Sequence, residues 1–276
     1  MILELHAHTD HSRGKKIYYD GISSPEEMVK GAKEAGADGI FITDHDNISG
    51  ALEAQKFGEK YGVKVFVGEE VSTKSGHMLA LGIHELIRPG MTVDETLDEI
   101  HRQGGIGIAV HPFDIRREGM GYECLKCDAI EVFNSMNLDR YANKKAMKIA
   151  REKGMPVIAG SDAHWERMLG HGQIEVKSDN LEGILNDIKN GRVTIKKMEY
   201  VRLRTIMNMS LGKLRKSHDH ILRYIEKNYS WPKKQISRCL LRLTTRDTIG
   251  LGSFYKFLTL IAFGSVVIYS QARRII

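Results

Sequence analysis

Short apolar runs recur through the first two thirds of the chain, and amphipathic stretches separate most of them. Apolar runs of about four to six residues, bounded by glycine, proline or charged residues, are typical of buried strands. Strands that alternate with helices favour a parallel sheet, because each parallel pair needs a crossover connection. The pattern predicts an α/β fold, either a parallel barrel or a doubly wound sheet. The predicted strands cover residues 2–5, 39–43, 63–67, 78–83, 106–110, 129–133 and 156–160.

Helix start and stop signals lie between these runs. Ser24 with Glu27, and Thr92 with Glu95, each form a capping box that satisfies free amide groups of a first helical turn. Asn180 is a third candidate N-cap, and a glycine follows the end of each predicted helix. The predicted helices begin near residues 25, 93, 138 and 181 and end before Gly36, Gly104, Gly154 and Gly191.

Histidine and acidic residues follow the predicted strands. In α/β folds the carboxyl ends of parallel strands share one edge, where binding sites form. His6 and His8 come after the first run, and an extended chain places both on one face. Imidazole and carboxylate groups suit Zn, Mn or Fe, and such a number of them exceeds what one ion takes. We therefore expect two or three divalent metal ions, held by His6, His8, His45, Glu70, His77, His111, Asp162 and His164.

Five motifs carry a resemblance to a known family. They are His6-Ala7-His8-Thr9, Thr43-Asp44-His45-Asp46, Gly68-Glu69-Glu70-Val71-Ser72, His111-Pro112 and Gly160-Ser161-Asp162-Ala163-His164. In order and spacing these motifs resemble the PHP (polymerase and histidinol phosphatase) domain over about residues 1–191. The resemblance implies a distorted (β/α)7 barrel with a trinuclear metal site and phosphoesterase chemistry.

The resemblance also implies how the ligands divide among the ions. His6, His8, Glu70 and Asp162 resemble the ligands of the first ion. His45 and His164 resemble ligands of the second ion, and Glu70 with His77 and His111 resembles those of the third. Glu70 is preferred to Glu69 because it precedes Val71-Ser72, as the bridging glutamate does in the family.

One position departs from the family pattern. Many members carry Ser-Asp-Gly shortly after the first motif, where the aspartate helps to bind the second ion. This chain has Ser12-Arg13-Gly14 at that place. We expect His11 or Asp20 to replace the missing ligand, and His11 is favoured over Asp20.

Hydrolysis of a phosphate ester is the reaction that this set of residues favours. Clustered ions lower the pKa of a bridging water, so that hydroxide forms near neutral pH, and they neutralise the phosphate. The expected substrate is a small phosphorylated molecule such as a nucleotide or histidinol phosphate. The predicted catalytic residues are Asp162, His45 and Arg116, and the predicted substrate-binding residues are Arg116, Arg117, Asn134 and Arg13.

Charge is divided unevenly along the chain. The formal net charge is +6, but residues 192–276 hold 18 Lys and Arg against 4 Asp and Glu, a net charge of +14, and residues 1–191 carry −8. A strongly basic segment suits an anionic partner, either nucleic acid or an anionic membrane surface. The division predicts a barrel at residues 1–195, a basic and mainly helical extension at 196–248, and an apolar helix at 249–276.

The end of the chain leaves two alternatives open. Residues 257–272 are uncharged, but this run is shorter than the ~20 residues of a spanning helix. Attachment to a membrane and packing against the barrel or in a dimer are weighed equally. Three cysteines, an odd number, argue against a disulfide framework. With no signal-peptide pattern at the N-terminus, the expected location is cytoplasmic, with membrane association through the tail as an alternative.

Two other functions compete with the phosphatase. One is a nuclease in which the basic part holds RNA or single-stranded DNA. The other is a binding protein docked on a membrane or on nucleic acid, with weak catalysis because of Arg13. In all three hypotheses the basic part determines where the protein docks, and the barrel carries the chemistry.

Overall fold

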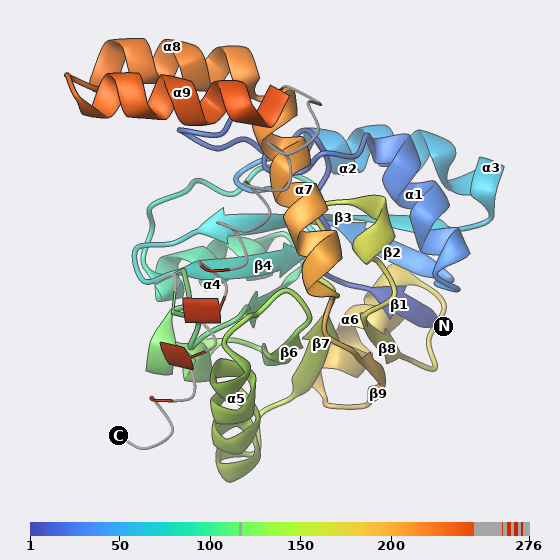
Figure 1. Cartoon of the computed structure of the whole chain (residues 1–276). Helices are drawn as coiled ribbons and strands as arrows, with labels where there is room; N and C mark the ends of the chain where they lie inside the picture. Colours follow the sequence, from blue (N-terminus) through green and yellow to red (C-terminus); the bar gives the residue numbers. More distant parts are fainter. Residues whose placement is uncertain (116–117, 246–260, 262–263, 266–267, 270–271, 273–276) are drawn as a thin grey trace.

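A computed structural model describes residues 1–115 and 118–245, together with residues 261, 264–265, 268–269 and 272 (Figure 1). The strands are β1 (Ile2–Glu4), β2 (Gly39–Ile42), β3 (Lys64–Ser72), β4 (His77–Leu81), β5 (Ile106–Ala109), β6 (Ala129–Asn134), β7 (Val157–Gly160), β8 (Gly172–Glu175) and β9 (Thr194–Met198). All seven predicted strands are present. Strands β8 and β9 were not predicted, because neither is an apolar run. β8 has a single large aliphatic residue, and in β9 exposed residues alternate with half-buried ones.

The sheet is not uniformly parallel, which corrects the expectation of a parallel fold. In the described residues its order is β7-β6-β5-β4-β3-β2-β1-β8-β9. Strands β1 to β3 are parallel and β5 to β7 are parallel, but β4 runs antiparallel to both of its neighbours. A short connection reverses the chain after β3, and His77 pairs with Ser72. The first residue of β4 therefore lies at the edge where the parallel strands end.

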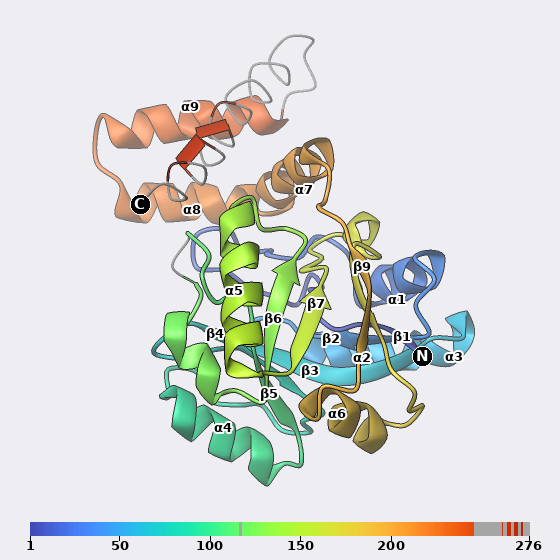
Figure 2. The ribbon, with the colours of Figure 1, turned by 90° about the horizontal axis from the view of Figure 1, so that it is seen from below.

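The sheet curls until the segments after its first and seventh strands meet. Ala7 and Ala163 form a parallel bridge, in which the His8 amide donates to the Ala163 carbonyl at 2.8 Å and the Ala163 amide donates to the His6 carbonyl at 3.2 Å. Figure 2 shows β6 and β7 beside one another under α5 (Arg140–Lys153). The predicted distorted barrel is confirmed, and its closure occurs beside the residues singled out as ligands.

Helices cover the barrel, and the four predicted helices are all present. The helices are α1 (Pro25–Glu34), α2 (Ser49–Ala54), α3 (Gly58–Tyr61), α4 (Val93–Arg102), α5, α6 (Leu181–Lys189), α7 (Leu203–Lys216), α8 (His218–Asn228) and α9 (Lys233–Thr245). Both predicted capping boxes form, at Ser24 with Glu27 and at Thr92 with Glu95. Asn180 caps α6 by accepting from the Gly183 amide at 2.9 Å.

The core is divided between the inside of the barrel and the layers under the helices. Phe41, Leu79 and Ile108 belong to one buried cluster, and apolar residues of α6 extend this cluster. Two further clusters lie under α1 and under α4 with α5. Because the core fills the barrel, the site must be built at its rim rather than within it.

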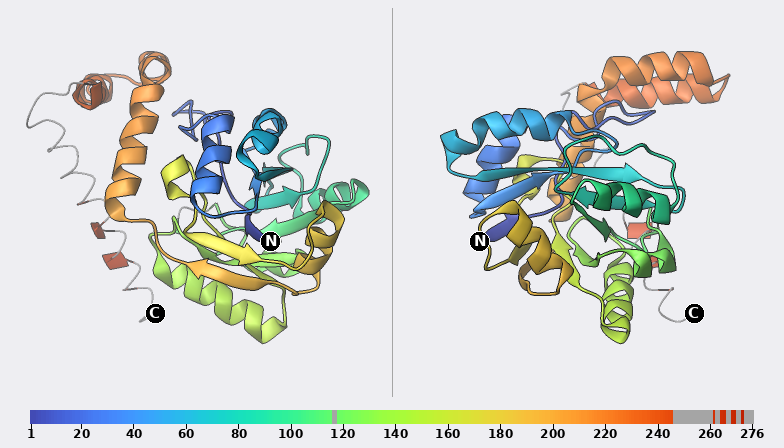
Figure 3. Two further views of the ribbon diagram at one scale, coloured as in Figure 1. Left: turned by 90° about the vertical axis from the view of Figure 1, so that its right-hand side faces the viewer. Right: turned by 180° about the vertical axis from the view of Figure 1, so that it is seen from behind.

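The basic extension begins by packing on the barrel. Ile206 and Met209 of α7 are buried in the same cluster as residues of α1. Helices α8 and α9 then form a hairpin that projects from the barrel (Figures 1 and 3). The boundary predicted between residues 195 and 196 falls inside β9, so the sheet continues to Met198.

The predicted apolar helix at 249–276 lies almost entirely outside the described residues. Within the part of the chain that the structure describes, no helix is long and apolar enough to cross a membrane. Docking of the extension on nucleic acid or on an anionic membrane stays a prediction.

The cap of α4 gives a test of the fold away from the strand ends. Thr92 Oγ1 accepts from the Glu95 amide at 3.3 Å, and the Thr92 amide donates to Glu95 at 2.8 Å. We expect Thr92→Ala to lower the free energy of unfolding by about 1 kcal/mol, because it leaves an amide of the first turn without an acceptor. Thr92→Ser keeps the hydroxyl and should restore most of the loss in a denaturant titration. Equal stability of Thr92→Ala and the wild type would contradict this role of the cap.

Candidate metal centre

Imidazoles and carboxylates converge where the chain leaves the strands of the barrel. Four groups of three residues are candidate metal sites. Within each group the possible ligand atoms all lie within 4.8 Å of one another. His6, His8, His45 and Glu70 each belong to two of these groups, so the groups form one continuous cluster. The cluster residues are His6, His8, His45, Glu70, His77, His111, Asp162 and His164.

The Glu70 carboxylate lies at the centre of the cluster. Its position on β3 places it opposite Leu79 of β4 and beside His45, which bridges to it after β2. The side chain is buried, and each of its oxygens faces imidazole nitrogens. Oε1 lies 2.9 Å from His77 Nδ1 and 3.1 Å from His111 Nε2, and Oε2 lies 3.1 Å from His8 Nε2, 3.2 Å from His6 Nε2 and 3.3 Å from His45 Nδ1.

Asp162 and Asp20 extend the cluster on the side of β7. Asp162 Oδ1 lies 3.5 Å from His6 Nε2 and 3.4 Å from His8 Nε2. Asp20 Oδ2 lies 2.7 Å from His164 Nε2 and 3.4 Å from His45 Nε2. Asp162 Oδ1 also lies 3.4 Å from His164 Nδ1, so each of these carboxylates links several imidazoles, as Glu70 does at the centre.

Glu131 on β6 supports the cluster from behind. Its Oε1 lies 3.0 Å from His6 Nδ1, and its Oε2 accepts from the His111 amide at 2.9 Å. An acceptor on Nδ1 leaves Nε2 of His6 directed at Glu70 and fixes the orientation of the ring. Gly160 makes room for this contact, because a Cβ there would collide with Glu131 Oε1. Glu131 lies in β6 and is not among the residues predicted for the site.

Backbone strain is concentrated at the same place. Among the described residues, the non-glycine positions with positive φ are Asp46 (47°), His111 (30°) and Asp162 (49°). The left-handed region is unfavourable for residues with a side chain, and such strain persists only where the surroundings impose it. Two of the three are cluster residues, and Asp46 follows His45 directly, so the turns after β2, β5 and β7 are held by the contacts of the cluster.

The electrostatic field of the cluster favours positive charge. Burial disfavours the charged form of His8, but contacts with Asp162 and Glu70 outweigh it and raise the pKa of His8 to about 9. Burial also opposes ionisation of Glu70, yet His45, His77 and His6 hold its pKa well below the usual range. His164 differs, because burial and the neighbouring Lys213 lower its pKa to about 4. The carboxylates therefore stay ionised, and their negative charge attracts a cation to the imidazoles around them.

The residues fit divalent metal ions. Nδ1 of His8 and Nδ1 of His111 have no hydrogen-bond partner in the described part of the chain. Buried polar atoms normally have a hydrogen-bond partner, and a bound metal ion can take the place of that partner at an imidazole nitrogen. The donor set is imidazole and carboxylate, which suits several first-row metals and does not single out one of them.

Comparison with known proteins agrees with this chemistry. The PHP-associated family model matches residues 140–193. Uncharacterized protein MJ1587 of Methanocaldococcus jannaschii is 34% identical over 159 residues, which cover 55% of this chain and 93% of that protein. This chain belongs to the PHP family.

Two further proteins are similar over smaller parts or at lower identity. Phosphoribosyl 1,2-cyclic phosphate 1,2-diphosphodiesterase of Eggerthella lenta is 33% identical over 91 residues, which are 31% of this PHP chain and 32% of that protein. A solved two-domain protein from Bacteroides vulgatus, described as containing a predicted PHP-like metal-dependent phosphoesterase, shares the fold with a TM-score of 0.60. It is 19% identical, and the match covers 71% of this chain and 64% of that one.

Of the two candidates for the missing aspartate of the PHP pattern, Asp20 reaches the cluster and His11 does not. His11 lies away from the cluster, with Nδ1 2.8 Å from Ser49 Oγ and Nε2 3.3 Å from Glu53. Asp20, the second choice, contacts His45 and His164. These positions favour Asp20 over His11 as the replacement, because residues 12–20 fold back and bring Asp20 to the cluster.

Two of the four predicted substrate-binding residues of the PHP chain, Arg13 and Asn134, have other contacts. Arg13 donates to the Asp10 carbonyl and lies over the rings of Tyr18 and Tyr19, each at 4.5 Å. Asn134 is buried and donates to Glu131 at 3.0 Å and to Asp162 at 3.1 Å, so it positions carboxylates instead of facing a substrate. Arg116 and Arg117 lie outside the described residues.

A cation that the sequence did not indicate does reach the cluster. Lys213 of α7 places its Nζ 2.7 Å from Asp20 Oδ1. The two residues are 193 positions apart, so no local pattern connects them. In the sequence Lys213 is one of the 18 Lys and Arg residues of the basic segment.

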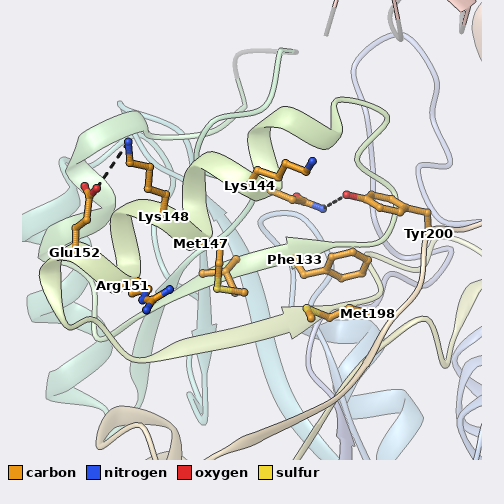
Figure 4. Close-up of a pocket in the computed structure, with 10 residues that line it drawn as sticks. Phe133, Lys144, Met147, Lys148, Arg151, Glu152, Met198 and Tyr200 are labelled. Atoms are coloured by element: carbon orange, nitrogen blue, oxygen red, sulfur yellow. Dashed lines mark hydrogen bonds and ion pairs between the residues drawn. The ribbon is translucent and has the colours of Figure 1, made fainter. Parts of the chain in front are cut away.

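A separate surface pocket of about 690 Å³ lies beside α5, and Figure 4 shows its side chains. Phe133, Met147 and Tyr200 line it, and its lining includes none of the cluster residues. Asn143 links the pocket to the centre, because it donates to Tyr200 Oη at 3.2 Å and to the Asn134 carbonyl at 3.0 Å.

The close approach of Gly160 to Glu131 can be tested by adding a methyl group. We expect Gly160→Ala to destabilise the protein by about 1–3 kcal/mol, the usual range for overpacking, because the buried carboxylate must leave His6. The measurement is the free energy of unfolding in denaturant. In a Glu131→Ala background the added Cβ no longer meets the carboxylate, so the same change should cost less. An equal cost in both backgrounds would refute the proposed collision.

Proposed function

We propose that this PHP chain is a metal-dependent phosphoesterase that hydrolyses a small phosphorylated substrate. The observation that carries the proposal is the continuous cluster around Glu70, in which four overlapping groups of candidate ligands share residues. Overlapping groups suit adjacent ions that share a bridging carboxylate, which is the arrangement used for phosphoryl transfer. The relative from Eggerthella lenta is named as a phosphodiesterase, and this supports the same class of reaction.

The residues of the cluster divide into ligands and supports. His6, His8, Asp162 and Glu70 are the proposed ligands of one ion, His45 and His164 with Asp20 those of a second, and His77 and His111 with Glu70 those of a third. Bound ions supply an acidified water and neutralise the charge of the phosphate during in-line displacement. Glu131 and Asn134 hold the imidazole of His6 and the carboxylate of Asp162 in place.

The same arrangement indicates a substrate that carries a phosphate group. A nucleotide or histidinol phosphate is the proposed substrate, because a cluster at the rim of a filled barrel can receive the phosphate of a small molecule. A nuclease remains the competing activity, and short RNA belongs in the same screen. Hydrolysis of RNA with none of small esters would reject the small-substrate proposal.

Loss of a proposed ligand tests the reaction directly. We expect Asp162→Ala and His45→Ala each to reduce hydrolysis of an aryl phosphate by more than the roughly 10- to 100-fold that loss of a supporting residue costs. The metal-loaded variants are compared for metal content and rate. Asp98→Ala and His84→Ala change exposed residues of the same types and should keep the wild-type rate. Full activity in both cluster variants would rule out the metal mechanism.

The protonation of His8 predicts how metal binding depends on pH. In the metal-free protein the Asp162 and Glu70 carboxylates raise the pKa of His8 to about 9. A metal ion must displace that proton, so affinity rises with pH below this value, by about tenfold per unit for each proton displaced. The sign is unambiguous, since the carboxylates are already ionised over this range.

Titration with a competing chelator at pH 6, 7 and 8 measures this dependence. We expect the apparent affinity to increase at each step. An affinity that is independent of pH would show that no proton leaves the cluster on binding, and would contradict the assignment of His8 as a ligand.

A further inference from the structure

The geometry points to Lys213 of α7 as a substrate-binding residue, which holds the phosphoryl oxygens of the ester at the metal centre. This inference rests on the proposed function and names the residue that receives the anionic part of the substrate. It also makes the basic extension a part of the active site, in addition to any role in docking.

Lys213 is joined to the cluster through one carboxylate. Its Nζ lies 2.7 Å from Asp20 Oδ1, and Oδ2 of the same carboxylate lies 2.7 Å from His164 Nε2 and 3.4 Å from His45 Nε2. The Lys213 side chain is 13% exposed, so its charge is largely shielded from bulk solvent. A lysine in this position acts on the cluster far more strongly than one on an open surface.

The backbone of α7 is fixed over the rim by several other contacts. Lys216 Nζ lies 2.7 Å from Asp10 Oδ2 and donates to the Ile22 carbonyl at 3.0 Å. The Tyr19 amide donates to Ser217 Oγ at 2.9 Å. Ile206 and Met209, at the other end of the helix, are buried against the barrel. Lys213 therefore stays at the rim even if its ammonium group leaves Asp20.

The Asp20 carboxylate is a possible partner both for the Lys213 ammonium group and for a metal ion. In the metal-free protein its two oxygens contact the ammonium group and the imidazoles. A divalent ion held by His45 and His164 would draw on the same carboxylate, and two cations repel one another. The flexible stem of lysine lets the ammonium group turn from Asp20 to a nearby anion, and a phosphate is an anion that lysine binds as a point charge.

Other described residues leave this role open. Arg13 is held by the Asp10 carbonyl and two tyrosine rings, and Asn134 is buried against carboxylates. A phosphate ester is an anion, and a cationic side chain at the cluster would stabilise it through a charge-assisted hydrogen bond. Lys213 is the lysine that the structure ion-pairs with a residue of the proposed second metal site.

A purely structural ion pair is the competing explanation, and the two differ in what they predict. If Lys213 only holds Asp20 in place, its loss should weaken metal binding and leave the affinity for phosphate on the loaded protein unchanged. If Lys213 binds substrate, its loss should weaken phosphate binding. It should leave metal affinity equal or higher, because a like charge is removed.

The experiment compares Lys213→Met, Lys213→Gln and Lys213→Arg in the full chain. Calorimetry measures the affinity for the metal alone, then the affinity of the metal-loaded protein for inorganic phosphate. We expect Met and Gln to weaken phosphate binding by about 10- to 100-fold, the range for loss of a hydrogen bond to a charged group. We expect Arg to retain most of it. In hydrolysis the same variants should raise KM more than they lower kcat.

Lys216→Met is the matched control, because it removes a neighbouring ion pair between α7 and the rim without touching a cluster residue. It should leave phosphate affinity within about twofold of wild type, against the larger loss expected from a charged hydrogen bond. Wild-type phosphate affinity in both Lys213→Met and Lys213→Gln would overturn the inference. So would a loss of metal affinity that accounts for the whole effect.

The outcome also separates this inference from the proposed function. If the wild type hydrolyses phosphate esters but binds phosphate independently of Lys213, only the inference fails. If phosphate binding depends on Lys213 but no ester is hydrolysed, only the proposed function fails.

Discussion

A buried carboxylate is the constraint on which the rest of this structure depends. Glu70 is shielded from water, and an ionised group in such a place is stable only when positive or hydrogen-bonding partners surround it. Its oxygens meet imidazoles from four separate parts of the chain. Each partner requires a strand to end at the right height. The curl of the sheet, the reversed strand β4 and the bridge between Ala7 and Ala163 bring these strand ends together.

The same requirement explains where the chain accepts unfavourable geometry. Positive φ at His111 and Asp162 and a glycine without room for a Cβ beside Glu131 are costs that a fold without the cluster would avoid. They occur behind the candidate ligands and not in the layers under the helices, where packing is apolar. Glu131 holds the imidazole of His6 and Asn134 holds the carboxylate of Asp162, so these supporting residues fix the orientation of the candidate ligands.

Local sequence patterns were sufficient for the repeating parts of the molecule. Strand ends and capping residues depend on near neighbours, so seven strands and four helices could be predicted. The eight cluster residues lie beside the predicted strands, and the preference for Glu70 over Glu69 came from the resemblance to the PHP pattern. The Glu69 carboxylate accepts from the Ile87 amide. The loop between the first strand and α1 could not be predicted. Whether His11 or Asp20 turns inward depends on how residues 12–20 fold back, and β8 and β9 lack the apolar run that would announce them.

The contrast between an acidic barrel and a basic extension has a local meaning as well as a global one. Charge asymmetry by itself indicates an external anionic partner, but Lys213 and Lys216 pair with Asp20 and Asp10 on the rim of the same chain. Part of the basic charge therefore forms ion pairs within the molecule, next to the candidate metal centre. A chain cut after Lys197 would lose α7 with its buried residues, so loss of hydrolysis in such a fragment could not distinguish a docking role from a role in the site. Single substitutions in α7 can make that distinction, because they leave the packing of Ile206 and Met209 in place.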